Sequence, residues 1–104
     1  MPCMKSRAHL LVTGRVQGVG YRAWARDQAR LLTASGWVRN LRDGRVEAVL
    51  EGERPVLELL LERCRQGPAL AQVVSIEATW GDPEGLWAFE IRATAEEPEP
   101  VSER

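Results

Sequence analysis

Cysteine, histidine and long apolar runs are all scarce in this chain. The two cysteines, Cys3 and Cys64, are too few and too far apart to form a disulfide scaffold or a zinc site. The longest uninterrupted apolar run is only a few residues, which excludes a transmembrane helix and makes a membrane partner unexpected. The first residues lack the apolar core of a secretory signal, so we expect the protein in the reducing cytoplasm.

The chain is short, because 104 residues are enough for one domain of common size. This length excludes a dinucleotide-binding dehydrogenase, a TIM barrel and a kinase, which all need far more chain. Apolar residues make up 44% and charged residues 28% of the sequence. This is the ordinary balance of a globular protein, so wholesale disorder is excluded as well.

The charge is balanced over the whole chain but not along it. The formal net charge is −1, yet residues 1–45 carry a net charge of +7 and residues 46–104 carry −8. A positive first half favours an anionic ligand. Solvated helix faces followed by an acidic tail would give the same pattern, and charge alone does not separate the two interpretations.

The spacing of apolar residues predicts five strands and two helices. Short apolar runs predict the strands, and apolar stripes three and four residues apart predict the helices. The predicted strands cover residues 8–13, 37–41, 45–50, 73–80 and 87–92, and the predicted helices cover residues 21–33 and 55–66. We expect a mobile segment over residues 1–7, one domain over residues 8–94 and an acidic, disordered tail over residues 95–104.

This order, β-α-β-β-α-β with an extra strand at the end, predicts a ferredoxin-like α+β sandwich. Its antiparallel sheet has four to five strands, and the two helices cover one face. In the third strand apolar residues alternate with Glu47 and Glu51, so we expect one buried face. The apolar face of the fourth strand includes Val74, and we expect Phe89 and Ile91 of the last strand to point inward.

Three glycines in seven positions, Gly14, Gly18 and Gly20, separate the first strand from the first helix. Glycines let backbone N–H groups converge into a concave nest, and the first N–H groups of the helix point into the same space. This unit predicts an anion site, with phosphate as the anion. Arg22, in the first helical turn, can lean back over the loop and donate two hydrogen bonds to a phosphate. The alternative interpretation is that Arg22 is an ordinary solvated arginine on the helix surface, like Arg26.

Asn40 stands near the end of the second predicted strand, just before a hairpin. In a ferredoxin-like sheet that end can lie beside the glycine loop, where a neutral amide can both accept from and donate to a water molecule. An asparagine next to a turn is also common without any chemistry. Composition alone favours that simpler interpretation.

Two stretches of the sequence resemble signatures of a known family. Residues 12–22, VTGRVQGVGYR, closely resemble the first signature of the acylphosphatase family, and residues 36–47, GWVRNLRDGRVE, resemble the second. The order of predicted elements agrees over about residues 8–93. One departure is Tyr21, where the family most often has phenylalanine, and we expect only an altered core contact there.

The resemblance implies a small monomeric enzyme, an acylphosphatase, which hydrolyses the carboxyl–phosphate anhydride bond of small-molecule acyl phosphates without a metal or organic cofactor. Carried over by motif position, Arg22 binds the phosphoryl group together with the backbone of the loop, and Asn40 orients the attacking water. The loop residues implied in phosphate binding are Arg15, Val16, Gln17, Gly18, Val19 and Gly20. Neither signature offers a ligand-facing histidine or carboxylate, so a substrate phosphate oxygen is expected to take the proton.

Two other functions share this fold class. RNA-recognition domains use a basic, aromatic sheet, but the third strand, RVEAVL, lacks their glycine–aromatic motif, so nucleic acid is not the expected partner. A non-enzymatic phosphate-sensing module would also fit a glycine loop with Arg22. His9 lies away from both signatures and Cys64 falls on the apolar stripe of the second helix, so we expect neither to take part in catalysis.

Overall fold

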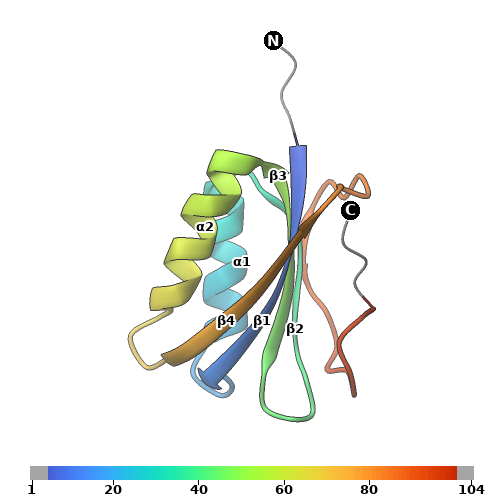
Figure 1. Ribbon diagram of the computed structural model, residues 1–104. Helices are drawn as coiled ribbons and strands as arrows, with labels where there is room; N and C mark the ends of the chain where they lie inside the picture. The colour runs from blue at the N-terminus through green and yellow to red at the C-terminus, as the bar shows by residue number, and fades with distance from the viewer. Residues whose placement is uncertain (1–4, 101–104) are drawn as a thin grey trace.

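The computed structural model describes residues 5–100, which form five strands and two helices. Along the chain these are β1 (Lys5–Arg15), α1 (Tyr21–Leu31), β2 (Ser35–Asn40), β3 (Val46–Glu53), α2 (Arg54–Gln66), β4 (Gln72–Gly81) and β5 (Phe89–Ile91). The strands form one sheet in the order β4-β1-β3-β2-β5, and both helices pack on one face of it (Figure 1). The predicted ferredoxin-like α+β fold is confirmed. No helix within the described residues is long and apolar enough to cross a membrane.

The fifth strand departs from the expected antiparallel sheet. Neighbours among the first four strands pair antiparallel, whereas β5 pairs parallel with β2 and places Ile91 beside Val38. β4 and β2 run in opposite directions on the two sides of β1 and β3. A chain that leaves the end of β4 and crosses the sheet therefore enters β5 in the direction of β2. Apolar spacing predicts a strand here but carries no information on its direction.

The core lies between the helices and the sheet. Its helical part consists of Tyr21, Ala25 and Ala29 from α1 and Leu57, Leu60, Leu61 and Cys64 from α2. Both stripes follow the spacing predicted from the sequence. Burial raises the pKa of the Cys64 thiol to about 11, so the thiol stays protonated at neutral pH and packs as an apolar side chain.

A bulge between β1 and β4 reverses the faces of part of β4. The register shifts between Thr13 and Gly14, where the two backbones are so close that a Cβ on Gly14 would lie 2.2 Å from the carbonyl oxygen of Gln72. Val74, predicted on the apolar face, is therefore 77% exposed, and Val73 packs against the core instead. Gly14 is required by this close approach of two strands rather than by the loop that follows it.

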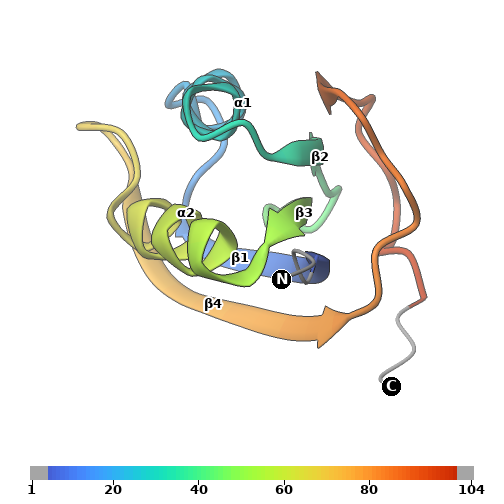
Figure 2. The ribbon, with the colours of Figure 1, turned by 90° about the horizontal axis from the view of Figure 1, so that it is seen from above.

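The sheet face opposite the helices is also covered, contrary to the single buried face expected for β3. Glu47 and Glu51 are 0% and 3% exposed, because the chain after β4 passes over them. Figure 2 shows this segment on the side of the sheet away from α1 and α2. The last strand differs as well: Phe89 is buried as predicted, but Ile91 is 38% exposed.

Both ends of the described chain differ from the expected mobile segment and disordered tail. Residues 5–7 belong to β1. Residues 95–100 lie against the sheet, where the N–H of Glu99 donates to the Glu47 carboxylate and its side chain pairs with Arg7. The acidic composition that suggested disorder thus supplies a partner for the half-buried Arg7. Of the two expected segments, residues 1–4 and 101–104 lie outside the described residues.

Glu51 makes the fold sensitive to acid. Burial by itself raises the pKa of this carboxyl, but the N–H groups of Glu84, Leu86 and Gly85 together with the Arg7 guanidinium outweigh it, and the pKa lies below its ordinary value of 4.5. The folded state therefore binds fewer protons than the unfolded chain at acid pH. The stability that this carboxylate contributes is complete above pH 4.5 and is lost as the pH falls through the folded-state pKa.

Replacement of Glu51 by glutamine removes this charge while keeping the shape of the side chain. We expect Glu51→Gln to lower the free energy of unfolding at pH 7 by about 1–3 kcal/mol, because a buried amide cannot accept from all four donors. The variant should also lose less stability than the wild type between pH 7 and pH 3. Urea unfolding at a series of pH values measures both effects. Parallel curves for the two proteins would contradict this role of Glu51.

Candidate active site

The loop between β1 and α1, residues 16–20, presents free backbone donors. Gly18 and Gly20 have φ angles of +74° and +81°, in the left-handed region that favours glycine. Within the described residues, the N–H groups of this loop donate to no backbone carbonyl. A Cβ on either glycine would meet no atom within 4 Å. The loop is thus an open nest of donors, a geometry that suits an oxyanion.

The N-terminus of α1 adds positive potential to the same space. The helix begins at Tyr21 with Gly20 as its N-cap, no side chain caps it, and no acidic residue stands in its first turn. The first N–H groups and the positive end of the helix dipole therefore have no negative partner in that turn. An anionic ligand would supply that partner.

Arg22 differs from the other two arginines of α1 in having no hydrogen-bond or ion-pair partner within the described residues. Arg26 forms an ion pair with its neighbour at 3.2 Å, and Arg30 donates to a backbone carbonyl of β5 at 3.0 Å. Arg22 is half-buried and, together with both glycines of the loop, lines a cavity of about 210 Å³. The fold therefore brings the predicted loop and the predicted arginine together at one cavity.

Asn40 ends β2 with its side chain on the helix-covered side of the sheet. It lies two residues beyond Val38, a member of the core, so both side chains point the same way. The Oδ1 atom of Asn40 is buried and has no hydrogen-bond partner within residues 5–100. Buried amide oxygens are rarely left unpaired in folded proteins. This one can accept a hydrogen bond from a bound molecule such as water.

Gln17 ties the glycine loop to the hairpin that follows Asn40. Its Nε2 atom donates to the carbonyl oxygens of Leu41 at 2.7 Å and of Arg45 at 2.8 Å. The loop and the end of β2 are therefore neighbours, although 24 and 28 residues separate the bonded pairs. No local pattern indicates this contact, because the acceptors are backbone atoms of a distant segment.

The side chains of Val16, Gln17 and Val19 do not face the open side of the loop as donors. Val16 is buried in the core, Val19 packs against the core, and Arg15 is exposed. The valines and Gln17 can therefore serve a ligand only through their backbone N–H groups. Ile91, for which the sequence predicted a core position, is a further lining residue of the cavity.

Two larger cavities, of about 350 and 540 Å³, lie elsewhere on the molecule. Neither is lined by the glycine loop or Arg22, so the donor chemistry selects the smaller cavity for an anion. Asn40 lines none of these three cavities and reaches the loop only through the hairpin that Gln17 binds. His9 lines the first of them, with its Nε2 atom 2.6 Å from the Glu47 carboxylate. Over residues 5–100, no group of three or more His, Cys, Asp or Glu side chains is placed to hold a metal ion.

Comparison with known sequences assigns the chain to a family. The family model described as Acylphosphatase matches residues 8–91. The chain belongs to the acylphosphatase family. It is 54% identical over 79 residues to the acylphosphatase of Chloroflexus aurantiacus, and the matched region covers 76% of this chain and 86% of that relative. It is 56% identical over 86 residues to the acylphosphatase of Natronomonas pharaonis, and the matched region covers 83% of this chain and 94% of that relative.

A solved acylphosphatase structure is similar as well. The crystal structure of the acylphosphatase from Bacillus subtilis superimposes with a TM-score of 0.82 at 35% sequence identity, over 84% of this chain and 98% of that chain. The family assigned from the two signatures is therefore confirmed, and so is the enzyme class.

Tyr21 carries a hydroxyl where the acylphosphatase signature most often has a plain ring. The phenol donates to the carbonyl oxygen of Cys64 at 2.7 Å, and burial raises its pKa above 10.0. Tyr21→Phe should leave that carbonyl without its donor and lower stability by about 1 kcal/mol. We expect little change in turnover, because the ring stays on the core stripe. Thermal unfolding and an acylphosphatase assay measure the two effects, and a large loss of turnover in a folded variant would contradict a purely structural role.

Proposed function

We propose that this chain hydrolyses small-molecule acyl phosphates at the cavity lined by the glycine loop and Arg22, in the cytoplasm and as a monomer. One observation carries the proposal: loop N–H groups, a guanidinium and a buried amide oxygen, all without partners in the described residues, belong to adjoining segments. The donors suit a phosphate, and the amide oxygen suits a water molecule. A monomer is supported because all three groups come from one chain.

In the proposed complex the phosphoryl group lies in the nest of residues 16–20. The N–H groups and the Arg22 guanidinium donate to its oxygens, and the guanidinium can do so through two parallel hydrogen bonds. Negative charge spreads over these oxygens in the transition state of phosphoryl transfer. Donors held in place by a strand and a helix stabilise that charge without rearranging during the reaction.

The attacking water accounts for the role of Asn40. Its Oδ1 atom accepts one hydrogen of the water, which leaves an oxygen lone pair free to attack phosphorus. A new P–O bond forms to the water oxygen, and the bond between phosphorus and the acyl oxygen breaks. The electron pair of the broken bond leaves with the carboxylate, and the water proton ends on the inorganic phosphate. Among residues 5–100, no histidine or carboxylate lines the cavity, so we assign the proton to a phosphate oxygen.

The RNA-binding alternative is not favoured. RNA-recognition sheets need an open face on which bases stack, whereas here the chain after β4 covers the face opposite the helices. The tryptophan on that face, Trp37, is 2% exposed. The guanidinium groups of Arg39 and Arg92 each lie 4.7 Å from the centroid of its ring.

Hydrolysis of benzoyl phosphate in the presence of a chelator tests the proposal. We expect rapid release of benzoate and phosphate, and much slower cleavage of p-nitrophenyl phosphate, whose leaving group is not an acyl oxygen. No turnover of benzoyl phosphate by the folded protein would contradict the proposed reaction. Binding of inorganic phosphate without turnover would point to the phosphate-sensing alternative.

A further inference from the structure

Residues 84–99, here called the C-terminal strap, begin and end on the sheet face opposite the helices and include β5 at the sheet edge. Buried carboxylates hold the strap at both ends. At the first end, Glu51 accepts the N–H groups of Glu84 at 2.8 Å, Gly85 at 3.1 Å and Leu86 at 2.9 Å. A carboxylate that is 3% exposed holds this end through the backbone alone, so the contact does not depend on the strap's side chains.

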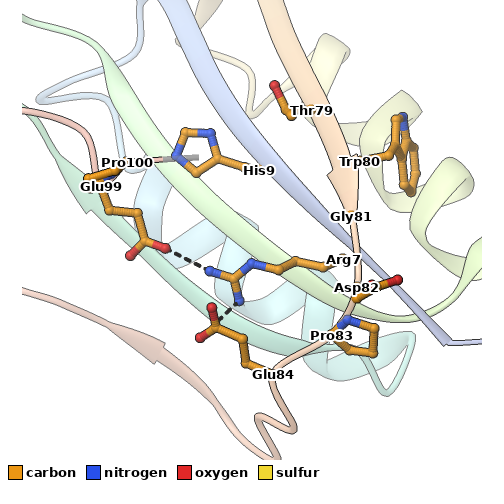
Figure 3. A pocket seen from close by; sticks show the side chains of 10 residues that line it. All are labelled: Arg7, His9, Thr79, Trp80, Gly81, Asp82, Pro83, Glu84, Glu99 and Pro100. Atoms are coloured by element: carbon orange, nitrogen blue, oxygen red, sulfur yellow. Dashed lines mark hydrogen bonds and ion pairs between the residues drawn. The ribbon is translucent and has the colours of Figure 1, made fainter. Parts of the chain in front are cut away.

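The second end of the strap is held at Glu99. Its N–H donates to the Glu47 carboxylate at 2.8 Å, and its own carboxylate accepts from Arg7 at 2.7 Å. Figure 3 shows Arg7 between Glu99 and Glu84, with an ion pair to each. Glu47 also accepts from Arg39 at 2.7 Å. Arg7 therefore joins the two ends of the strap.

Between these ends the strap runs along the outer edge of β2 and reaches Asn40. The N–H of Gly36 donates to Ala88 at 2.8 Å, and the N–H of Arg92 donates to the carbonyl of Val38 at 2.9 Å. The N–H of Ala95 donates to the carbonyl oxygen of Asn40 itself at 3.0 Å. The carbonyl of Ala95 in turn accepts from the N–H of the second hairpin residue, Arg42, at 2.9 Å.

The backbone of Asn40 is thus held from two sides. Gln17 fixes the hairpin after it to the glycine loop, and Ala95 fixes its carbonyl from the sheet edge. The side chain of Asn40 makes no hydrogen bond through Oδ1 within the described residues, so its aim depends on the backbone. Small displacements of a group that orients a reactant lower the rate without weakening the binding of the rest of the substrate.

We propose that the C-terminal strap is a positioning element of the active site, and that the Ala95 N–H is the contact through which it aims Asn40. This inference rests on the role proposed above for Asn40. The phosphate-binding loop lies on the other side of Asn40 and neither accepts a hydrogen bond from the strap nor donates one to it within residues 5–100. Ile91 of the strap lines the phosphate cavity, but its apolar side chain has no group that could bind the anion. A loosened strap should therefore slow the attack of water and leave phosphate binding intact.

Ala95→Pro tests the contact directly, because proline has no N–H to donate to Asn40. We expect kcat for benzoyl phosphate to fall by about tenfold to a hundredfold, with KM and the inhibition constant of inorganic phosphate changed by no more than about twofold. Glu97→Pro is the matched control. Its N–H donates to no backbone acceptor within the described residues, and Pro98 already biases it to an extended backbone. This control should turn over at the wild-type rate.

Glu99→Pro tests the remote anchor and keeps the inference open to refutation if Ala95→Pro does not fold. It removes the N–H to Glu47 and the carboxylate on Arg7, at a residue that Pro100 already biases to an extended backbone. We expect a smaller loss of kcat with the same constant KM. In an Asn40→Ala background, neither proline should lower kcat further, because no amide remains to be aimed.

The outcomes separate this inference from the proposed function. If Asn40→Ala keeps wild-type turnover, the role of Asn40 is wrong and this inference fails with it. If Asn40→Ala loses turnover but both Ala95→Pro and Glu99→Pro keep it, the inference alone is wrong. A rise in KM and in the phosphate inhibition constant that matches the fall in kcat would also overturn it, because a merely structural loosening would disturb both parts of the site.

Discussion

Replacement of Arg22 by alanine is expected to lower kcat/KM for benzoyl phosphate by about 10³-fold or more, the range seen when an arginine is removed from a phosphoryl-transfer site. Arg22 lines the same cavity as the two loop glycines, and its guanidinium has no competing partner within the described residues. Its loss removes a full charge from a site that otherwise offers only backbone dipoles. We therefore expect the affinity for inorganic phosphate to fall as well as kcat.

Arg26→Ala is the matched control for Arg22→Ala. Arg26 lies one turn further along α1, and its ion pair joins a half-buried guanidinium to the exposed carboxylate of Asp27. Such an ion pair contributes little, so its removal should change stability and turnover little. Stopped-flow or colorimetric assays of both variants, with circular dichroism to check folding, measure the difference. Equal turnover by Arg22→Ala and Arg26→Ala would contradict the assignment of Arg22 to the phosphoryl group.

The part of the site that the sequence predicted well is the part built from consecutive residues. A strand, a glycine loop and a helix follow one another between β1 and α1, so the placement of the loop beside Arg22 depends only on local geometry. In the structure the helix begins without a side-chain cap and without an acidic residue in its first turn. The residue types at the start of the helix determine both features, because a helix terminus is defined by its own few residues.

The parts that could not be predicted depend on contacts between distant segments. Glu47 and Glu51 alternate with apolar residues, which is the pattern of a solvent-facing row. They are buried because, apart from Arg39, their partners lie 33 to 52 residues away along the chain and include the N–H groups of Glu84 and Glu99. Contacts between distant segments also determine the direction of β5, the bulge at Gly14 and the hydrogen bonds of Gln17. Periodicity reports which face of a strand is apolar and not what later covers the other face.

Asn40 shows how the two kinds of information combine. Composition alone favoured an ordinary turn residue, and the resemblance of residues 36–47 to the second acylphosphatase signature favoured a role with water. The geometry supports the second interpretation, since Asn40 ends β2 with an unpaired, buried Oδ1 atom, judged over residues 5–100, beside the hairpin that Gln17 fixes to the loop. A turn asparagine would bond its own backbone.

Asn40→Ala is therefore expected to lower kcat for benzoyl phosphate by about 10²-fold to 10³-fold, as when one preorganised polar group is removed from a reaction site. KM and the inhibition constant of inorganic phosphate should stay near the wild-type values, because the loop and Arg22 hold the phosphoryl group without Asn40. Asn40→Asp should be as slow, and it should also bind phosphate less well, because a carboxylate would then face the anion.

The contrast between the two alanine variants tests the division of labour in the site. If donors bind the phosphoryl group and Asn40 only orients water, Arg22→Ala loses phosphate affinity and turnover together, whereas Asn40→Ala loses turnover alone. Phosphate inhibition measured on both variants decides between this scheme and one in which Asn40 also contacts the phosphoryl group. An equal loss of phosphate affinity in both variants would contradict the proposed role of Asn40, and the water would then need another acceptor, most simply the phosphate oxygen to which its proton is assigned.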